Sequence, residues 1–276
     1  MKRLALMSAV ATFAFGFIVA GTALANNAWG NYHWARTSNP FTLKLGDNVS
    51  TAWDSYLATA SNDWTQSSVL NTTVVPGQAI NGAICAPSAG RVEVCNAKYG
   101  PTGWVGIAQI WTDNNSHIVQ ARAAMNDYYL SKKPYNTPAW KRYVMCQEVG
   151  HALGLDHQNE TSNNANLGSC MDYTNDPDGG AGGASASDPS NEHPNAHDYA
   201  QLEAIYADLD IYNSYDNSAS SPSSPPGNGR GNNLDEPSGW GRLVSGSAKG
   251  SGGSVAVYAR DLGGGQKLFT FVIWAE

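Results

Sequence analysis

Charged side chains are scarce in this sequence. Asp, Glu, Lys and Arg make up 14% of its 276 residues, against about 25% in an average globular protein. This scarcity excludes a coiled coil, whose composition is dominated by charged, helix-forming residues. Basic residues are the scarcer sign, with 16 Lys and Arg against 23 Asp and Glu and a net charge of −7, which argues against nucleic acid as a partner. Nine Trp and thirteen Tyr indicate a folded chain with a sizeable core.

Long hydrophobic runs are also missing, except for one at the start of the sequence. Residues 4–19 are almost wholly apolar, follow Lys2 and Arg3, and precede Ala23-Leu24-Ala25. This order is typical of a secretory signal peptide with cleavage after residue 25. The alternative, a membrane anchor, needs a run of roughly 20 residues. We therefore predict a signal peptide at 1–25, a secreted protein of the extracellular space or cell envelope, and no stable membrane insertion after cleavage.

Cysteine is rare, and no two cysteines have the Cys-x-x-Cys spacing of many metal sites. Four are present, and an even number in a secreted chain suggests disulfides. Four cysteines allow three pairings. Proximity in the sequence favours Cys85 with Cys95, on either side of a turn-rich stretch, and Cys146 with Cys170.

The order of strand-like and helix-like patterns predicts an α+β fold. Alternating apolar and polar residues mark the first strand, and a stripe of apolar residues four and three apart marks the first helix. We expect strands at 41–45, 69–75, 91–95, 104–111 and 118–125, and helices at 53–64, 137–153 and 193–210. Residues 176–190, which are small and polar, are expected to form a surface loop.

The last part of the sequence differs in composition from the rest. Residues 213–239 are rich in Ser, Pro, Gly and Asn, which is typical of a linker. The small C-terminal β segment at 240–276 then carries strand patterns at 254–258 and 267–274. Because this segment is too short to bury a core of its own, we expect it to dock on the main domain or on a partner.

A cluster of potential metal ligands lies in the sequence Gln147-Glu148-Val149-Gly150-His151-Ala152-Leu153-Gly154-Leu155-Asp156-His157. Gln147 and His151 are four residues apart, so a helix presents them on one face. Gly154 can end that helix, because glycine accepts the left-handed conformation that follows a helix. The chain can then bring His157 back towards His151. Three ligands beside the carboxylate of Glu148, with one position open for water, are typical of a catalytic zinc site.

This segment resembles the metzincin metallopeptidases, whose pattern is His-Glu-x-x-His-x-x-Gly-x-x-His. Its residues are most similar to those of the matrixin branch. Ser169-Cys170-Met171-Asp172-Tyr173 resembles the Met-turn of that family, where a methionine (here Met171) forms a hydrophobic floor under the metal. The resemblance covers roughly residues 30–212. It implies a metzincin-like (zincin) catalytic domain at 26–212, with a twisted mixed sheet, an active-site helix and a C-terminal helix.

The sequence departs from the family pattern at the first ligand, where the family has histidine and this chain has Gln147. Gln147 could bind zinc through its amide oxygen, as a weaker and neutral ligand. Another side chain could complete the site instead, such as Tyr173 or one of the more distant histidines (His117, His193 or His197). A third reading is a catalytically impaired pseudopeptidase that acts as an extracellular binding module. We favour the active peptidase because the remaining residues of the pattern are intact.

The resemblance implies a secreted zinc-dependent metalloendopeptidase that hydrolyses protein or peptide substrates. The zinc ligands would be Gln147, His151 and His157, and the metal would lower the pKa of a bound water. Glu148 would act as the general base, and Tyr173 would donate a hydrogen bond to the developing oxyanion. An edge strand at 104–111 would bind the peptide by strand addition.

Weaker signals concern calcium, isolated histidines and assembly. Residues 176–180 could supply calcium ligands, since matrixin-like domains often bind calcium, but the spacing of a helix–loop–helix site is missing. His33 and His117 could join a structural zinc site, but no spaced partner is present, so we expect ordinary surface or core residues there. We expect a monomer. If the protein is purely a binding module, it should bind no zinc at His151 and His157.

Overall fold

The structure is a computed structural model, and it describes residues 26–78, 85–180, 186–216 and 234–275. The predicted signal peptide at 1–25 and most of the predicted linker lie outside these residues. Within them, no helix is both long enough and apolar enough to cross a membrane.

The described residues form a mixed β-sheet with a few helices, so the α+β prediction is confirmed. The strands are β1 (His33–Trp34), β2 (Phe41–Asn48), β3 (Leu70–Pro76), β4 (Ser88–Ala89), β5 (Val92–Ala97), β6 (Trp104–Thr112), β7 (His117–Asn126), β8 (Arg242–Gly246), β9 (Val255–Gly263) and β10 (Gln266–Trp274). The helices are α1 (Asp54–Trp64), α2 (Asp127–Leu130), α3 (Pro138–Ala152), α4 (Ala196–Ile205) and the short 3-10 helix η2 (Pro237–Gly239).

The last long helix is shorter than the sequence pattern predicts. It begins after Asn195, whose side chain accepts hydrogen bonds from the backbone in a capping box with Asp198. It ends at Ile205, and Leu209, which lies beyond it, is 57% exposed. The predicted range of 193–210 therefore contains the helix, and the Asn195 capping box sets where it begins.

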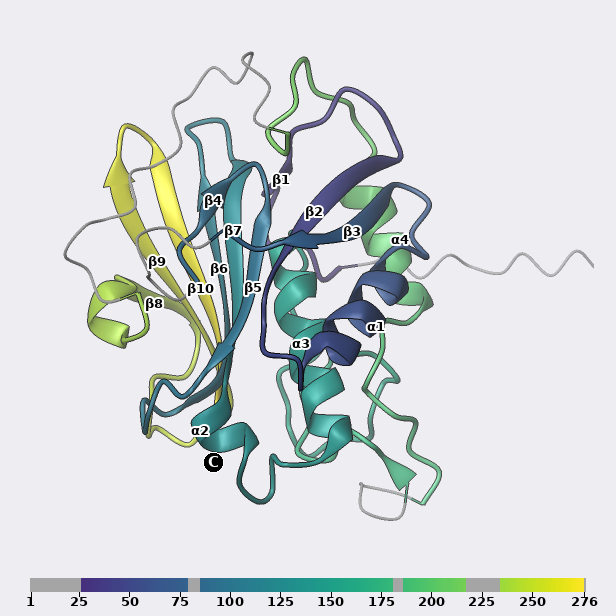
Figure 1. The fold of residues 1–276 in the computed structure, drawn as a ribbon, viewed down its shortest axis with the longest axis vertical. Coiled ribbons are helices and arrows are strands. Elements are labelled where there is room, and N and C mark those ends of the chain that lie inside the picture. The colour runs from purple at the N-terminus through teal and green to yellow at the C-terminus, as the bar shows by residue number, and fades with distance from the viewer. Residues whose placement is uncertain (1–25, 79–84, 181–185, 217–233, 276) are drawn as a thin grey trace, which may run out of the picture.

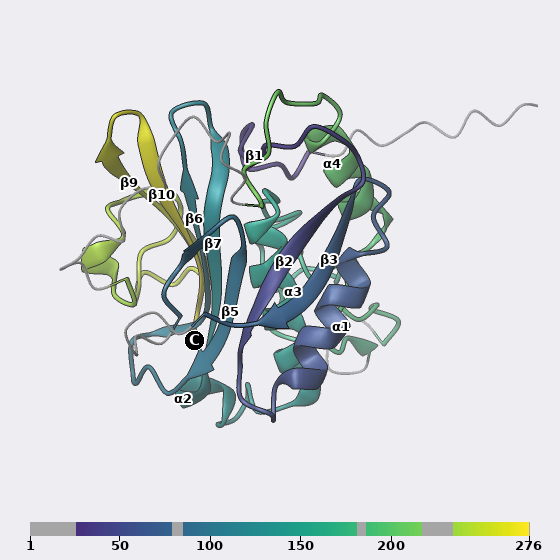
Figure 2. The ribbon, with the colours of Figure 1, turned by 45° about the horizontal axis from the view of Figure 1, so that its top comes forward.

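The strands form one sheet in the order β3-β2-β5-β7-β6-β10-β9-β8, and β1 and β4 also pair with β7. On one side of β7 the strands β5, β2 and β3 are parallel to their neighbours. On the other side β6, β10, β9 and β8 are antiparallel. The long helices α1, α3 and α4 lie on one side of this sheet (Figures 1 and 2). The main core lies between these helices and the sheet and includes Trp34, Trp53 and Trp64, each at most 2% exposed.

The C-terminal β segment continues the main sheet, so its predicted docking on the main domain is confirmed. β10 pairs with β6 from Lys267 to Trp274, and β9 and β8 extend the sheet beyond it (Figure 1). Phe269, Phe271 and Ile273 belong to the core on the helix side. Leu268, Val272 and Trp274 are buried in clusters on the opposite face. A strand that is apolar on both faces is suited to the interior of a sheet.

The predicted edge strand at 104–111 is therefore not an edge. β6 lies between β7 and β10, so its backbone pairs on both sides. The prediction is wrong because the partner strand comes from residues 266–274, far along the chain, and no local pattern around β6 announces it.

Both predicted disulfides are present. Cys85 pairs with Cys95, with Cα atoms 5.7 Å apart, and Cys146 pairs with Cys170, with Cα atoms 5.9 Å apart. No described cysteine is free. The second bridge ties α3 to the segment just before Met171, which fixes the distance between two parts of the candidate site.

Candidate metal centre

The helix α3 carries the first part of the predicted motif, and its ends are set by sequence. Thr137 accepts a hydrogen bond from the backbone N–H of Trp140, and Pro138 occupies the first turn. After the helix, Gly154 has a φ of +97°, and a Cβ atom there would lie 2.5 Å from the carbonyl oxygen of Tyr32. Only glycine fits both conditions. The chain can therefore reverse sharply after α3.

This reversal brings His157 to His151, as the sequence predicts. Their Nε2 atoms are 3.1 Å apart. The Nδ1 atom of His151 lies 2.9 Å from the carbonyl oxygen of Leu155. Because a carbonyl only accepts, this Nδ1 carries a proton and leaves Nε2 with its lone pair. Burial and the neighbouring His157 ring hold the pKa of His151 well below its usual value, so the ring stays neutral and able to bind a metal.

Gln147 is completely buried next to this pair on α3. Its amide nitrogen donates to the carbonyl oxygen of Cys170 at 2.7 Å and to the Tyr143 hydroxyl at 3.1 Å. A carbonyl oxygen can only accept a hydrogen bond, so the amide group of Gln147 must direct its nitrogen, and not its oxygen, towards the Cys170 carbonyl. The amide oxygen of Gln147 is buried and has no hydrogen-bond partner in the described chain. An unpartnered buried oxygen is costly, and a metal ion would satisfy it.

Glu148 is also completely buried, and neither carboxylate oxygen has a hydrogen-bond partner among the residues the structure describes. Burial raises the pKa of this carboxyl well above its usual value. A buried, unpartnered carboxyl is rare in a structural role and is typical of an active site.

These donors fit zinc. Tetrahedral zinc with bonds of about 2.0–2.1 Å places its ligand atoms about 3.3 Å apart, close to the 3.1 Å between the two Nε2 atoms. The unpartnered oxygen of Gln147 supplies a third donor from the adjacent turn of α3. Two carboxylates lie near the other ring nitrogen of His157. Its Nδ1 atom is 3.6 Å from the Asp156 carboxylate and 3.7 Å from that of Glu160.

The predicted Met-turn lies directly against α3. Ser169 anchors it, because its hydroxyl donates to Asp198 at 2.6 Å and accepts from the backbone of Met171. Met171 is completely buried. A Cβ atom at Gly150 would lie 2.5 Å from the Met171 sulfur and 2.7 Å from the Trp64 ring. The helix therefore needs glycine at this point so that the Met171 sulfur can pack against α3.

Tyr173 is 1% exposed and lies beside Tyr143, the residue that holds the Gln147 amide. Burial raises the pKa of Tyr143, and Tyr173 adds to this effect. Tyr173 therefore belongs to the surroundings of the centre, and its role in stabilising an oxyanion stays a prediction.

Two of the more distant histidines are engaged elsewhere. His193 is exposed and bonds to Asp63 at 2.7 Å, and His117 bonds to Asp210 at 3.0 Å. These contacts give no support to the reading in which one of them completes the metal centre. The structure places His33 and His117 side by side, because β1 and β7 pair and bring the two rings to 5.0 Å. Parallel pairing of two distant segments is what the sequence pattern missed.

The predicted calcium loop gains little support. Asp176 has a raised pKa, caused by burial and by the nearby Asp178 and Asp188 carboxylates. Among the described residues, the groups of three or more converging His, Cys, Asp or Glu ligands do not include this loop. Calcium binding there stays a prediction.

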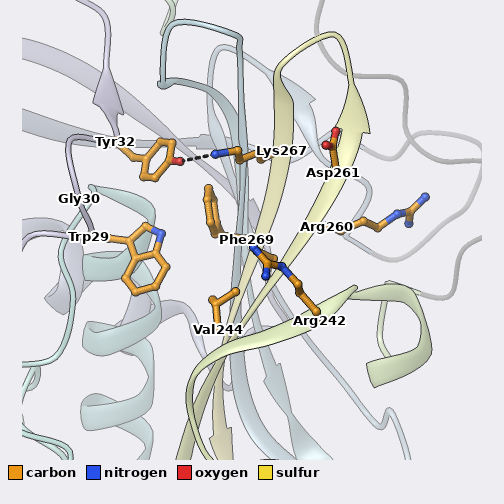
Figure 3. A pocket seen from close by; sticks show the side chains of 10 residues that line it. Trp29, Gly30, Tyr32, Arg242, Val244, Arg260, Asp261, Lys267 and Phe269 are labelled. Carbon is orange, nitrogen blue, oxygen red and sulfur yellow. Dashed lines mark hydrogen bonds between the residues drawn. The ribbon is translucent and has the colours of Figure 1, made fainter.

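The C-terminal strand covers the metal centre, a feature that the sequence did not indicate. Phe271 of β10 stacks on the His151 ring, with centroids 4.4 Å apart and planes inclined by 11°. Trp29, from the start of the described chain, contacts Phe269 and Phe271 edge-on. Figure 3 shows Trp29 and Tyr32 facing Phe269 across a pocket between this first segment and the C-terminal strands. His151 is consequently only 1% exposed.

No known protein family matches the chain by sequence, and no curated protein does. Among solved structures, the chain is similar to high choriolytic enzyme 1, a hatching enzyme zinc-protease from the medaka fish Oryzias latipes. The match covers 66% of this chain and 98% of that one, with 11% identity and a TM-score of 0.36. A likeness of this size does not establish a family, so the proposed function rests on the geometry of the site itself.

Gly150→Ala tests the packing of the Met-turn. In an ordinary helix interior, replacing glycine by alanine stabilises a protein by about 1 kcal/mol. Here we expect the opposite sign, a loss of about 1–3 kcal/mol, because the new methyl group overlaps Met171 and Trp64. Urea unfolding measures the change. In a Met171→Ala background the loss should shrink, and a stabilising effect of Gly150→Ala in the otherwise native chain would contradict the packing described.

Proposed function

We propose that this protein is a zinc-dependent metalloendopeptidase of the metzincin type, with Gln147, His151 and His157 as the metal ligands. The observation that carries the proposal is the convergence of two histidine Nε2 atoms at 3.1 Å at the end of α3, the helix that also carries the buried, unpartnered carboxylate of Glu148. Zinc, when bound, would polarise the scissile carbonyl and acidify a water molecule. The similarity of the motif residues to the matrixin branch supports the family assignment.

Each surrounding residue has a separate task in this proposal. Glu148 takes the proton from the attacking water and passes it to the leaving amine, which its free carboxylate oxygens allow. Tyr173 donates a hydrogen bond to the oxyanion. Met171 supplies the apolar floor, and Tyr143 with the Cys170 carbonyl orients the Gln147 amide so that its oxygen is available.

The protein acts outside the cell in this proposal. The predicted signal peptide supports export, and the two disulfides are compatible with an oxidising compartment. The substrate would be a protein or peptide, as the resemblance of the motif to the metzincins implies.

A second candidate, the catalytically impaired binding module, is favoured by one observation. The centre is buried, with Glu148 completely inaccessible and Phe271 stacked over His151. A substrate cannot reach it while β10 stays in place. Hydrolysis of peptides separates the two candidates, since both keep the same scaffold.

Glu148→Gln tests the catalytic base. The substitution keeps the size of the side chain and removes its ability to take a proton. We expect hydrolysis of casein-like substrates to fall by about 10²–10⁴-fold, the usual contribution of a general base, with zinc content unchanged. Mass-spectrometric metal analysis and a fluorescent casein assay measure the two quantities. Equal activity of the variant and the native protein would refute the mechanism.

Gln147→His tests the unusual ligand. Imidazole is a stronger donor than a carboxamide, so we expect tighter zinc binding. Changes behind a metal ligand already alter affinity by 10–100-fold, so replacing the ligand itself should change it by at least about tenfold. Competition with a zinc chelator measures the affinity. His193→Ala, a change at an exposed histidine, serves as the control. An unchanged affinity would show that Gln147 does not bind the metal.

A further inference from the structure

A second group of metal-ligating side chains lies outside the candidate metal centre. It consists of His33 on β1, His117 at the start of β7, and Asp210 after α4, with one potential ligand atom of each within 4.8 Å of the others. His117 Nε2 lies 3.0 Å from one oxygen of Asp210, and His33 Nε2 lies 3.3 Å from the other. All three residues are half-buried.

Hydrogen bonds fix the proton on the far nitrogen of both rings. His33 Nδ1 faces the carbonyl oxygen of Asn31 at 2.8 Å, which only accepts, so this nitrogen carries the proton. The Tyr212 hydroxyl donates its one proton to Asp113 at 2.6 Å. It can therefore only accept from His117 Nδ1, which lies 2.6 Å away.

In the neutral form of each ring, both Nε2 atoms consequently aim a lone pair at a carboxylate. Lone pairs facing an anion at 3.0–3.3 Å are stable only with a positive charge at this point, either a proton on each Nε2 atom or a metal ion bound by all three side chains. Histidines whose other nitrogen donates to a carbonyl or to a group bonded to a carboxylate are the usual ligands of zinc. Two imidazoles with one carboxylate are also a donor set that zinc accepts.

We propose that His33, His117 and Asp210 bind a zinc ion separate from the candidate metal centre. Arg36 donates to the second oxygen of Asp210 at 2.8 Å and leaves the first oxygen for the metal. The Asp113 carboxylate, 3.5 Å from His117 Nδ1, supplies a further negative charge behind His117. The negative charges of Asp113 and Asp210 offset the repulsion between Arg36 and a divalent ion.

The position of this site indicates a structural clamp with room for a water ligand. A cavity of about 390 Å³ borders His33 and Asp210 and is also lined by Asn31 and Asp208. The three ligands come from segments that are far apart in the sequence, so one ion would join the first strand, the β6–β7 hairpin and the chain after α4.

Zinc stoichiometry of the full-length protein tests this site. A His151→Ala/His157→Ala variant removes the two histidines of the candidate metal centre, and we expect it to retain one zinc per chain. Adding His117→Gln should remove that zinc and lower the thermal midpoint measured with zinc present, while adding His193→Ala should change neither. If the double variant does not fold, His33→Ala in the native chain should lower the zinc content by one.

The alternative to a bound zinc ion is that the imidazoles of His33 and His117 are both protonated and pair directly with Asp210. In that case the double variant holds no zinc, and His33→Ala leaves the zinc content of the native chain unchanged. Either result overturns the proposal. The outcome is independent of the peptidase proposal. The measured quantity is the zinc content of a variant in which the candidate metal centre has lost both of its histidines.

A different observation concerns access to the candidate metal centre. β10 lies antiparallel to β6 from Lys267 opposite Thr112 to Trp274 opposite Trp104. β10 therefore fills the side of β6 that the sequence predicts to be open to an extended peptide. The aromatic ring of Phe271 covers His151 at the same time. The segment thus occupies both the backbone edge and the space over the metal ligands.

The contacts that hold the segment differ between its two faces. On the face away from α3, Arg122 and Gln109 donate to the carbonyl of Leu234, and Arg122 also pairs with Asp235. On the metal side, Phe269 and Phe271 contact Trp29 edge-on, and Phe271 also stacks on His151. A cavity of about 450 Å³ lies between Trp29 and the C-terminal strands, and Lys267 to the Tyr32 hydroxyl, at 3.1 Å, is the bond drawn across it (Figure 3).

We infer that β8–β10 form an internal cover that must separate from β6 before a peptide reaches the metal centre. This inference rests on the proposed peptidase function, because it describes the regulation of that same site. The covered form is the resting state, and the small population of the uncovered form limits the apparent activity.

Two matched crosslinks in the full-length protein test the cover. Val272 lies opposite Ile107 on β6 and opposite Ala256 on β9, and all three side chains are buried in one cluster on the face away from α3. Ile107→Cys/Val272→Cys joins the cover to β6. Ala256→Cys/Val272→Cys joins two strands within the cover. Mass spectrometry confirms each bridge.

The readouts are the rate at which phenanthroline removes zinc and the rate of hydrolysis of a quenched fluorescent peptide. We expect the β6–β10 bridge to slow both by at least about tenfold, and the β9–β10 bridge to leave both close to native. Equal zinc release from both variants and the native chain would show that β10 is a permanent strand. If all three bind zinc and none hydrolyses peptide, the proposed function fails, and the zinc release rates still decide whether the cover opens.

Discussion

The candidate metal centre depends on one sharp reversal of the chain after α3. Gly154 makes the reversal possible, and the first segment of the described chain holds it, since the backbone N–H of Trp29 donates to the Gly154 carbonyl and Ala28 bridges to Leu155. The Leu155 carbonyl then fixes the proton of His151. Backbone geometry at this turn therefore sets both where His157 arrives and which nitrogen of His151 faces it.

Local spacing in the sequence was enough to predict this part of the centre. The interval between Gln147 and His151 is one helical turn, and Gly154 with His157 follows within a few residues, so no long-range contact is needed. The disulfide partners were also recoverable, because each pair is close in sequence. The environment of Gln147 could not be predicted from the sequence. Its amide nitrogen donates to Tyr143 and to Cys170, and only the folded chain shows that its amide oxygen has no hydrogen-bond partner among the described residues.

Contacts between distant segments could not be predicted. Asp210 is 93 residues from His117, and only the pairing of β1 with β7 brings His33 beside them. A strand at 267–274 was predicted, but its position in the sheet was not, because an apolar strand is compatible with many neighbours. The error about β6 follows from this, since an edge is a property of the whole sheet and is not encoded in the strand itself.

The separation between β6 and β10 has a kinetic consequence. Gln109 and Thr270, which bond across these strands, are 161 residues apart, whereas the two histidines of the metal centre are six apart. Closing a long loop costs more entropy than closing a short one and slows folding. We therefore expect the ligand cluster to assemble early and the C-terminal strands to add late. Each newly folded molecule would then pass through a stage in which its metal centre is formed and still open to solvent.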